Sequence, residues 1–236
     1  MGAFLSMQKF LATPLVAQWK FPFKVNPRFC RRRTTTFELK DNFWTHTINV
    51  NGYAVREVDS GRTLFRVMPT IEGQALNDRT KWLFDEYKIP VAHLTRIDDP
   101  NAAIYDVCLG KRQLPQPTVL TTLMIRFVPG RGDPLVCEIK DPHTGATSRI
   151  GCHGTWSQRA AILYLERGCG GRREPIAKIY RPRSHEMHYF KNQTYHVEAA
   201  IGVDIAFVLL ICAAMDDASF HFHQTHRHPL LLSLGM

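Results

Sequence analysis

Residues 202–217 read GVDIAFVLLICAAMDD, and every side chain from Ile205 to Met215 is apolar. As a helix this run extends roughly 16 Å, about half the thickness of a bilayer's hydrocarbon core. The length therefore argues against a membrane span. A helix that is apolar on every side must instead be enclosed by the rest of the protein.

Acidic residues stand at both ends of the apolar run. Asp204 places a carboxylate near the positive N-terminal end of the helix, and Asp216 with Asp217 ends the apolar sequence. The helix is therefore expected to form the centre of the fold. The residues assigned to this structural core helix are Asp204, Phe207, Leu210 and Ile211.

The chain ahead of the helix predicts short β-strands separated by turns. Asn51-Gly52 supplies the two positive φ angles of a tight hairpin turn. The expected strands are 47–50, 53–58, 63–67, 81–84, 90–97, 103–109, 119–128, 135–140, 160–166, 175–181 and 195–200. Strands with short connections favour antiparallel pairing and close into a barrel or stack as a sandwich. Because the helix needs enclosure, we expect a mainly β fold, a closed antiparallel β-barrel of about 12 strands around the helix.

The positive charge of the chain is concentrated at its N-terminus. No acidic residue precedes Glu38, and the remaining 23 basic and 21 acidic residues leave a net charge of only +2 out of +9. The seven basic residues of this stretch are Lys9, Lys20, Lys24, Arg28, Arg31, Arg32 and Arg33. A nearly neutral body argues against a nucleic-acid-binding face, which must neutralise several phosphates at once.

The sequence contains no recognisable catalytic or metal-binding motif. Its six cysteines form no Cys-x-x-Cys pair and lie among apolar residues, as small buried hydrophobic residues do in a reducing compartment. No nucleophile elbow or phosphate-binding glycine loop is present. We therefore expect a protein that is not an enzyme and that has no cofactor and no metal.

Three motifs together resemble those of the LURP-one-related family, whose relatives are the tubby C-terminal domain and the phospholipid scramblases. They are Asp59-Ser60-Gly61 followed by Leu64-Phe65-Arg66-Val67, then His153-Gly154-Thr155-Trp156, and Gly202-Val203-Asp204-Ile205-Ala206-Phe207 running on to Asp216. The resemblance covers about residues 36 to 220. It implies a closed β-barrel around a buried C-terminal helix, and a non-enzymatic domain. Family roles range from phosphoinositide binding in tubby proteins to membrane association in scramblases.

The expected organisation has three parts. Residues 1–34 form a basic, flexible N-terminal tail, residues 35–220 form the barrel domain, and residues 221–236 form a His-rich C-terminal tail. Two hypotheses for function follow. One is a binding module that contacts phosphoinositides or another anionic membrane surface; the other is a structural or adaptor protein that binds another protein without lipid specificity.

A basic cluster of the barrel domain is the candidate site for anionic lipid. Its members are Arg172, Arg173, Lys178, Arg181 and Arg183. Side chains of this kind hold phosphorylated headgroups through charge-assisted hydrogen bonds. The alternative is a solvated hairpin whose charges protect a strand edge.

The first residues fit the minimal myristoylation pattern, with Gly2 as the acceptor and Ser6 at the favoured position. Basic residues further along would supply the second signal that one acyl chain needs for stable anchoring. The same acid-free stretch also suits a mitochondrial transit peptide or a plain flexible tail. The expected location is cytoplasmic and peripheral to a membrane, or mitochondrial if residues 1–34 act as a transit peptide.

Histidines crowd the C-terminus, at positions 221, 223, 226 and 228. Such tracts can take up zinc or copper through neutral imidazole nitrogens. This tail offers no neighbouring groups to orient the ligands, so adventitious binding is the preferred interpretation.

Overall fold

The structure is a computed structural model that describes residues 12–41, 43–44, 52–68, 80–97, 99, 102–110, 118–125, 135–140, 145–168, 170–182 and 194–227. The expected strand at 47–50 lies outside these residues, as do Gly2 and Arg183.

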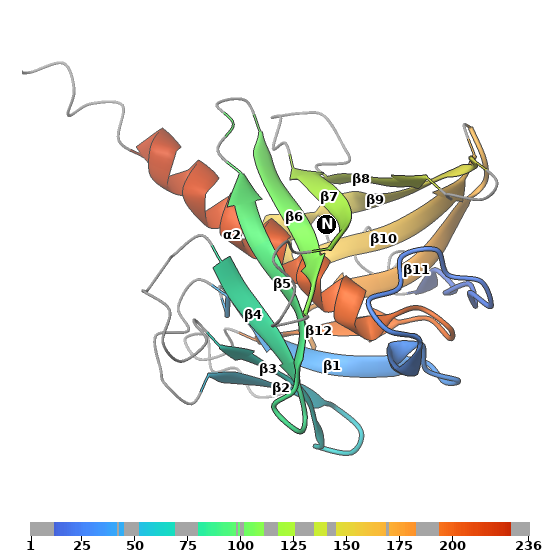
Figure 1. Ribbon diagram of the computed structural model, residues 1–236, viewed down its shortest axis with the longest axis horizontal. Helices are drawn as coiled ribbons and strands as arrows, with labels where there is room; N and C mark the ends of the chain where they lie inside the picture. Colours follow the sequence, from blue (N-terminus) through green and yellow to red (C-terminus); the bar gives the residue numbers. More distant parts are fainter. Residues whose placement is uncertain are drawn as a thin grey trace, which may run out of the picture.

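Twelve strands form a closed antiparallel barrel (Figure 1), which confirms the expected fold class. The strands are β1 (Thr35–Lys40), β2 (Tyr53–Glu57), β3 (Thr63–Met68), β4 (Thr80–Asp85), β5 (Pro90–Ile97), β6 (Ala103–Leu109), β7 (Val119–Ile125), β8 (Leu135–Lys140), β9 (Thr147–Thr155), β10 (Ala160–Arg167), β11 (Arg173–Tyr180) and β12 (Thr194–Ala199). Each strand pairs with its neighbours in sequence, and β12 pairs with β1 to close the barrel.

Two strands, β1 and β9, were not among those expected. In β9 two glycines interrupt the apolar alternation that marks a strand. Gly151 lies opposite Tyr164 of β10, and a Cβ at that position would come within 2.2 Å of the Tyr164 hydroxyl oxygen. The glycine therefore makes room for a neighbouring aromatic ring. This role follows from the pairing of β9 with β10 and cannot be read from the sequence of β9 alone.

The helix α2 (Ile205–Arg227) passes through the barrel (Figure 1). Phe207, Leu210 and Ile211 are completely buried, as expected for the core helix. Residues 221–227, which the sequence assigned to the tail, continue the helix. The C-terminal turns of the helix extend out of the barrel (Figure 1). Asp216 and Asp217, which end the apolar run, lie within the helix, and their carboxylates accept hydrogen bonds from the hydroxyl groups of Tyr195 and Tyr105.

Residues 12–34, assigned to the flexible tail, lie packed across one end of the barrel. Phe21, Phe23 and Phe29 are at most 5% exposed. The Phe23 ring stacks on Phe207 of α2 with 5.1 Å between ring centroids, and Phe29 contacts Phe65 of β3 edge to face at 5.0 Å. These aromatic side chains cover the end of the barrel at which α2 begins. We call it the capped end.

Candidate functional site

The capped end contains every turn that follows an even-numbered strand, because consecutive strands are antiparallel. The β2–β3, β4–β5 and β10–β11 turns therefore surround the start of α2. Residues 12–34, which we call the N-terminal segment, cross this end between the turns. The backbone N–H of Val16 donates to the Pro175 carbonyl at 2.8 Å, and farther along Arg28 and Arg33 form ion pairs with Asp85 and Glu57.

The predicted basic cluster is spread along β11. Arg172 and Arg173 lie at the capped end, whereas Arg181 lies just past the other end of the strand, where it pairs with Asp41 at 2.7 Å. Strand geometry separates Arg173 from Arg181 by roughly 26 Å. Lys178 pairs across the sheet with Glu198 at 3.8 Å. Of the described members, only Arg172 and Arg173 are brought together.

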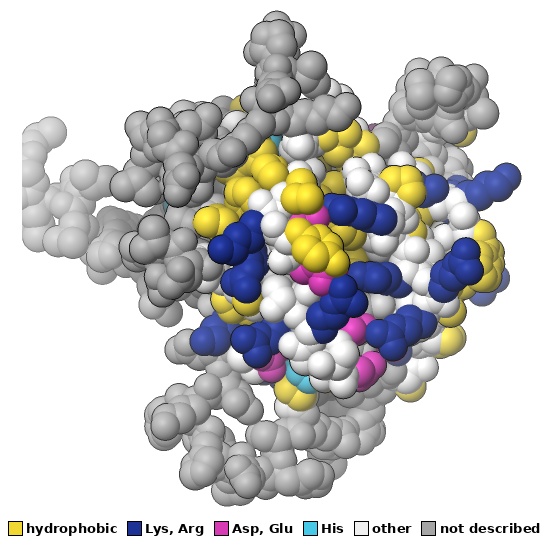
Figure 2. Space-filling model, turned by 60° about the horizontal axis from the view of Figure 1, so that its bottom comes forward, with side chains coloured by type: hydrophobic (Ala, Val, Ile, Leu, Met, Phe, Trp, Pro, Cys, Tyr) yellow, Lys and Arg dark blue, Asp and Glu magenta, His cyan; other side chains and the backbone are white. Residues whose placement is uncertain are grey.

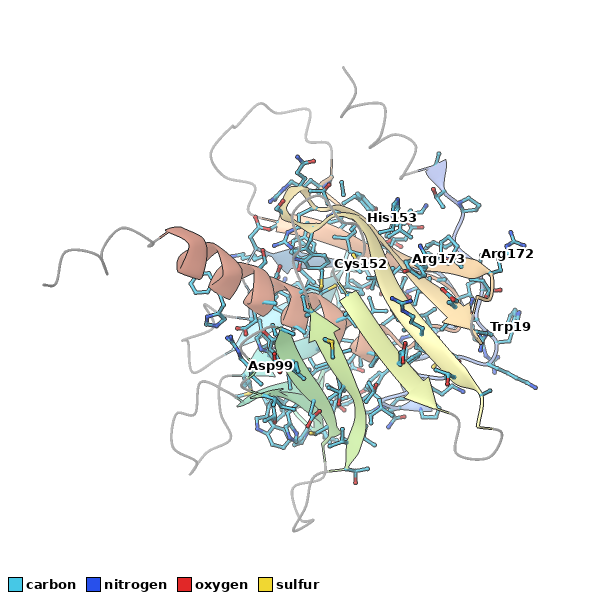
Figure 3. The ribbon with its side chains drawn as sticks, turned by 90° about the horizontal axis from the view of Figure 1, so that it is seen from above. Trp19, Asp99, Cys152, His153, Arg172 and Arg173 are labelled. Carbon is cyan, nitrogen blue, oxygen red and sulfur yellow. The ribbon has the colours of Figure 1, made fainter. Side chains whose placement is uncertain are left out.

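Residues of the N-terminal segment that are distant in sequence lie beside Arg172 and Arg173. The Arg167 guanidinium donates to the Gln18 side-chain oxygen at 2.7 Å and to the Lys20 carbonyl at 3.0 Å. The Gln18 amide in turn donates to Glu174 at 3.0 Å. These bonds hold Trp19 beside the β10–β11 turn, and Figure 3 shows Trp19, Arg172 and Arg173 at the same edge of the molecule.

Trp19 is 80% exposed, although both of its flanks are fixed. The backbone N–H of Gln18 donates to Ile201 at 2.7 Å, and the Gln18 side chain is 3% exposed. The indole is thus held in solvent by an ordered backbone. We call Trp19, Lys20, Arg167, Arg172 and Arg173 the Trp19 patch. A large ring with a polar N–H, next to cations, suits a surface that is apolar on one side and charged on the other.

Some charges of the patch have partners within the protein. The Arg173 guanidinium lies over the Tyr164 ring at 4.5 Å, and its Nε is 3.6 Å from a Glu166 carboxylate oxygen. Arg172 is exposed, and no ion pair joins it to any described residue. The side chains of Lys20 and Arg167 are also exposed. The patch therefore offers cations to an external partner.

Further basic residues continue around the capped end. The exposed cations of the N-terminal segment and the two turns on its far side are Lys24, Arg28, Arg32, Arg33, Arg62 and Lys88. Three of them pair with acidic residues, including Arg62 with Glu86 at 2.6 Å. Figure 2 shows Lys and Arg side chains interspersed with hydrophobic ones, and with acidic side chains that are fewer than the basic ones, on the face at the bottom of Figure 1.

Asp204 joins the N-terminal segment to the core helix. One carboxylate oxygen accepts hydrogen bonds from the backbone N–H groups of Ala206 and Phe207, and the other accepts from that of Asn26 at 3.0 Å. Burial raises the pKa of Asp204 to about 6, although the N–H donors oppose this rise. Asp204 thus stabilises both the first turn of α2 and the covering segment.

The opposite end contains a buried polar network. The Arg159 guanidinium lies 2.6 Å from Asp216, which also accepts hydrogen bonds from Trp156 and Tyr195 at 3.0 Å each. Burial raises the pKa of Asp216, and Arg159 opposes that rise. Arg159 also bonds Asp41, the partner of Arg181. Arg181 therefore belongs to a set of contacts that fasten α2 to the barrel.

Comparison with known protein families assigns the barrel. The LURP-one-related family model matches residues 35–216. The chain belongs to the LURP-one-related family. This confirms the resemblance seen in the sequence motifs. Within the Trp19 patch, Arg167, Arg172 and Arg173 lie inside the matched region, whereas Trp19 and Lys20 precede it.

A solved structure shares this fold. An X-ray structure of a protein from Arabidopsis thaliana is 18% identical, covers 83% of this chain and 97% of its own, and superposes with a TM-score of 0.50. At that identity the likeness concerns the fold. The search of curated proteins found no match. Membership of the LURP-one-related family, with this barrel fold, supports a binding module of non-enzymatic type.

Neither a membrane-spanning helix nor a metal-binding cluster occurs among the described residues. No helix within the described ranges has the length and apolarity needed to cross a membrane. No group of three or more His, Cys, Asp or Glu side chains in the same ranges is placed to hold a metal ion. Among the C-terminal histidines, His221 lies 3.7 Å from Asp217, and His228 is outside the described residues.

Proposed function

We propose that this LURP-one-related protein binds anionic membrane surfaces through its capped end. The observation that carries the proposal is Trp19, which is exposed on an ordered backbone whose flanking residues Gln18 and Lys20 bond Arg167 of the Trp19 patch. Each Lys or Arg near an anionic bilayer contributes about 1 kcal/mol of attraction. Indole rings favour the headgroup layer, where their apolar face and polar N–H are both accommodated. The basic side chains and the exposed indole thus both favour an anionic membrane surface as the partner.

The N-terminal segment brings its basic residues to this end. Because Gln18, Asn26 and Arg33 are bonded to the barrel or to α2, the positive charge of residues 12–34 lies on the same end as Arg172 and Arg173. An anionic surface that approaches this end meets both sets of cations at once. This arrangement favours a membrane over a small anionic ligand, since exposed side chains rather than a deep pocket supply the charge.

The test is co-sedimentation of the full chain with vesicles of phosphatidylcholine alone, or with phosphatidylserine or a phosphoinositide added. We expect binding only to the anionic vesicles, weakened by salt. The double variant Lys20→Glu/Arg172→Glu should bind about tenfold more weakly or worse at low salt. Lys40→Glu, a charge reversal at the opposite end, should bind like the parent.

Two outcomes would overturn the proposal. The first is an absence of binding to any vesicle, which would favour a protein partner. The second is a loss of binding free energy for Lys40→Glu that is half or more of the loss for the double variant. Lys40→Glu changes the net charge by −2 and the double variant changes it by −4, so this ratio would mean that net charge alone, rather than the Trp19 patch, controls binding. Comparison of the two anionic lipids decides whether a phosphoinositide headgroup is preferred.

A further inference from the structure

The β4–β5 turn holds apolar side chains in solvent at a second place on the capped end. Tyr87 is 71% exposed and Ile89 is 53% exposed. Both belong to the connection between β4 and β5, residues 86–89. Exposed apolar side chains are unremarkable when single, but two on one short turn form a local apolar surface.

The turn is fixed by Asp85, which is 2% exposed. One Asp85 carboxylate oxygen accepts from the backbone N–H groups of Tyr87 at 3.0 Å and Ile89 at 2.8 Å. The other accepts from the Arg28 guanidinium at 2.6 Å. Lys88, between the two apolar residues, has a φ of 62°. The turn is therefore preorganised, so presenting Tyr87 and Ile89 to a partner requires little further ordering of the backbone.

The turn and the Trp19 patch lie on the same end of the barrel. Both the β4–β5 and β10–β11 turns follow even-numbered strands, and the N-terminal segment contacts each of them, through Arg28 at one and Gln18 at the other. The segment passes the first turn of α2 on the way, where Asn26 binds Asp204. Trp19 and the apolar side chains of the β4–β5 turn thus lie on different sides of the start of α2.

The surroundings of the turn are basic as well. Lys88 and Arg28 are exposed, and Arg62 from the neighbouring β2–β3 turn bonds Glu86 through two nitrogens, which neutralises that carboxylate. Exposed apolar side chains surrounded by basic ones complement an anionic bilayer. The headgroups attract the basic side chains, and the interfacial layer accommodates the apolar ones.

We propose that the Tyr87–Ile89 turn is a second apolar contact with the bilayer, a step that rests on the membrane docking proposed above. Trp19 and the turn then enter the headgroup layer together. Two separated contacts define an orientation, which one contact cannot do. In that orientation the N-terminal end of α2 faces the membrane and its C-terminal turns point away from it.

The test compares vesicle affinities of the full-length parent, Tyr87→Ser/Ile89→Ser, and the control Ile97→Ser, at low and high salt. Ile97 is 39% exposed and ends β5 at the opposite end of the barrel. We expect the double variant to bind anionic vesicles about tenfold more weakly at both salt concentrations, because an apolar contribution is not screened. Ile97→Ser should bind like the parent. Brominated lipids should quench the tryptophan fluorescence of the Tyr87→Trp variant more strongly than that of the parent, because the new indole would lie in the headgroup layer.

The outcomes separate this proposal from the membrane docking itself. If the parent binds anionic vesicles and the double variant binds equally well, the second contact is overturned while membrane docking stands. A loss only at low salt would also overturn it, because the effect would then be electrostatic. If the parent binds no vesicles, both proposals fail together.

Discussion

Asp216 lies inside the barrel, and Arg159 is the cation that compensates its charge. The Asp216 side chain is fully buried, and the Arg159 side chain is 7% exposed. The guanidinium also lies over the Tyr195 ring at 4.2 Å. The backbone of Arg159 has a φ of 52°, an uncommon conformation for a residue with a side chain. The surrounding contacts hold Arg159 in this conformation.

Replacing Arg159 by methionine is expected to destabilise the protein strongly. Arg159→Met leaves the Asp216 carboxylate buried without its cation, which costs about 3–5 kcal/mol. Urea unfolding followed by fluorescence measures the difference. The control Arg172→Met removes an exposed arginine and should change stability by no more than about 0.5 kcal/mol. Equal stabilities for the two variants would show that the buried pair contributes nothing.

Asp204 is expected to make stability depend on pH in the mildly acidic range. Its folded-state pKa of about 6 exceeds the ordinary 3.8, so between these values the folded state binds more protons than the unfolded state. The free energy of unfolding therefore falls as pH rises from about 4 to about 6, by on the order of 3 kcal/mol.

Asp204→Asn removes this titration while retaining a side-chain oxygen for the first turn of α2. Relative to the parent, the variant should lose less stability between pH 4 and pH 6. Urea midpoints at pH 4, 5, 6 and 7 give the comparison, and the difference between the two proteins cancels the contribution of other groups such as Asp216. Parallel curves across this range would refute a raised pKa at Asp204.

The N-terminal segment is an element of the barrel fold, and two of its aromatic residues have opposite roles. Phe23 is completely buried against Phe207, whereas Trp19 is 80% exposed. Truncation at residue 34 would uncover the apolar end of the barrel. A loss of membrane binding in such a truncated chain would therefore not distinguish a missing contact from a damaged fold.

Point variants separate these two roles. Phe23→Ala should lower the free energy of unfolding by about 3–5 kcal/mol, because it opens a cavity beside α2. Trp19→Ala should change it by about 0.5 kcal/mol or less and should weaken vesicle binding instead. Denaturant unfolding and co-sedimentation of the same two variants provide the check. A stable Phe23→Ala protein would show that the segment is only loosely attached.

At the level of the whole molecule, local sequence patterns were sufficient to predict the architecture. The all-apolar run from Ile205 to Met215 needs enclosure, and regularly spaced turns supply enough strands to enclose it. The glycine-containing strand β9 was missed because Gly151 is explained only by Tyr164 of the neighbouring strand. Arg159 was missed because its partners, the buried Asp216 and the half-buried Asp41, are distant in sequence.

The candidate site was predictable only in part. Arg172 and Arg173 are adjacent in sequence, so their joint position at a turn could be anticipated. Their proximity to Trp19 depends on how the N-terminal segment crosses the barrel end, through bonds between residues about 150 positions apart. The alternation of aromatic and basic residues from Trp19 to Lys24 was a signal of an ordered segment. Charge alone instead suggested a tail.

The most direct measurement is hydrogen–deuterium exchange of the full chain, with and without anionic vesicles. Docking through the capped end predicts slower exchange in residues 16–33 and in the β4–β5 and β10–β11 turns when vesicles are present. The turn around Trp156–Gln158, at the opposite end, should exchange at the same rate in both samples. Protection of that opposite turn, with the capped end unchanged, would contradict the proposed orientation and the proposed binding surface.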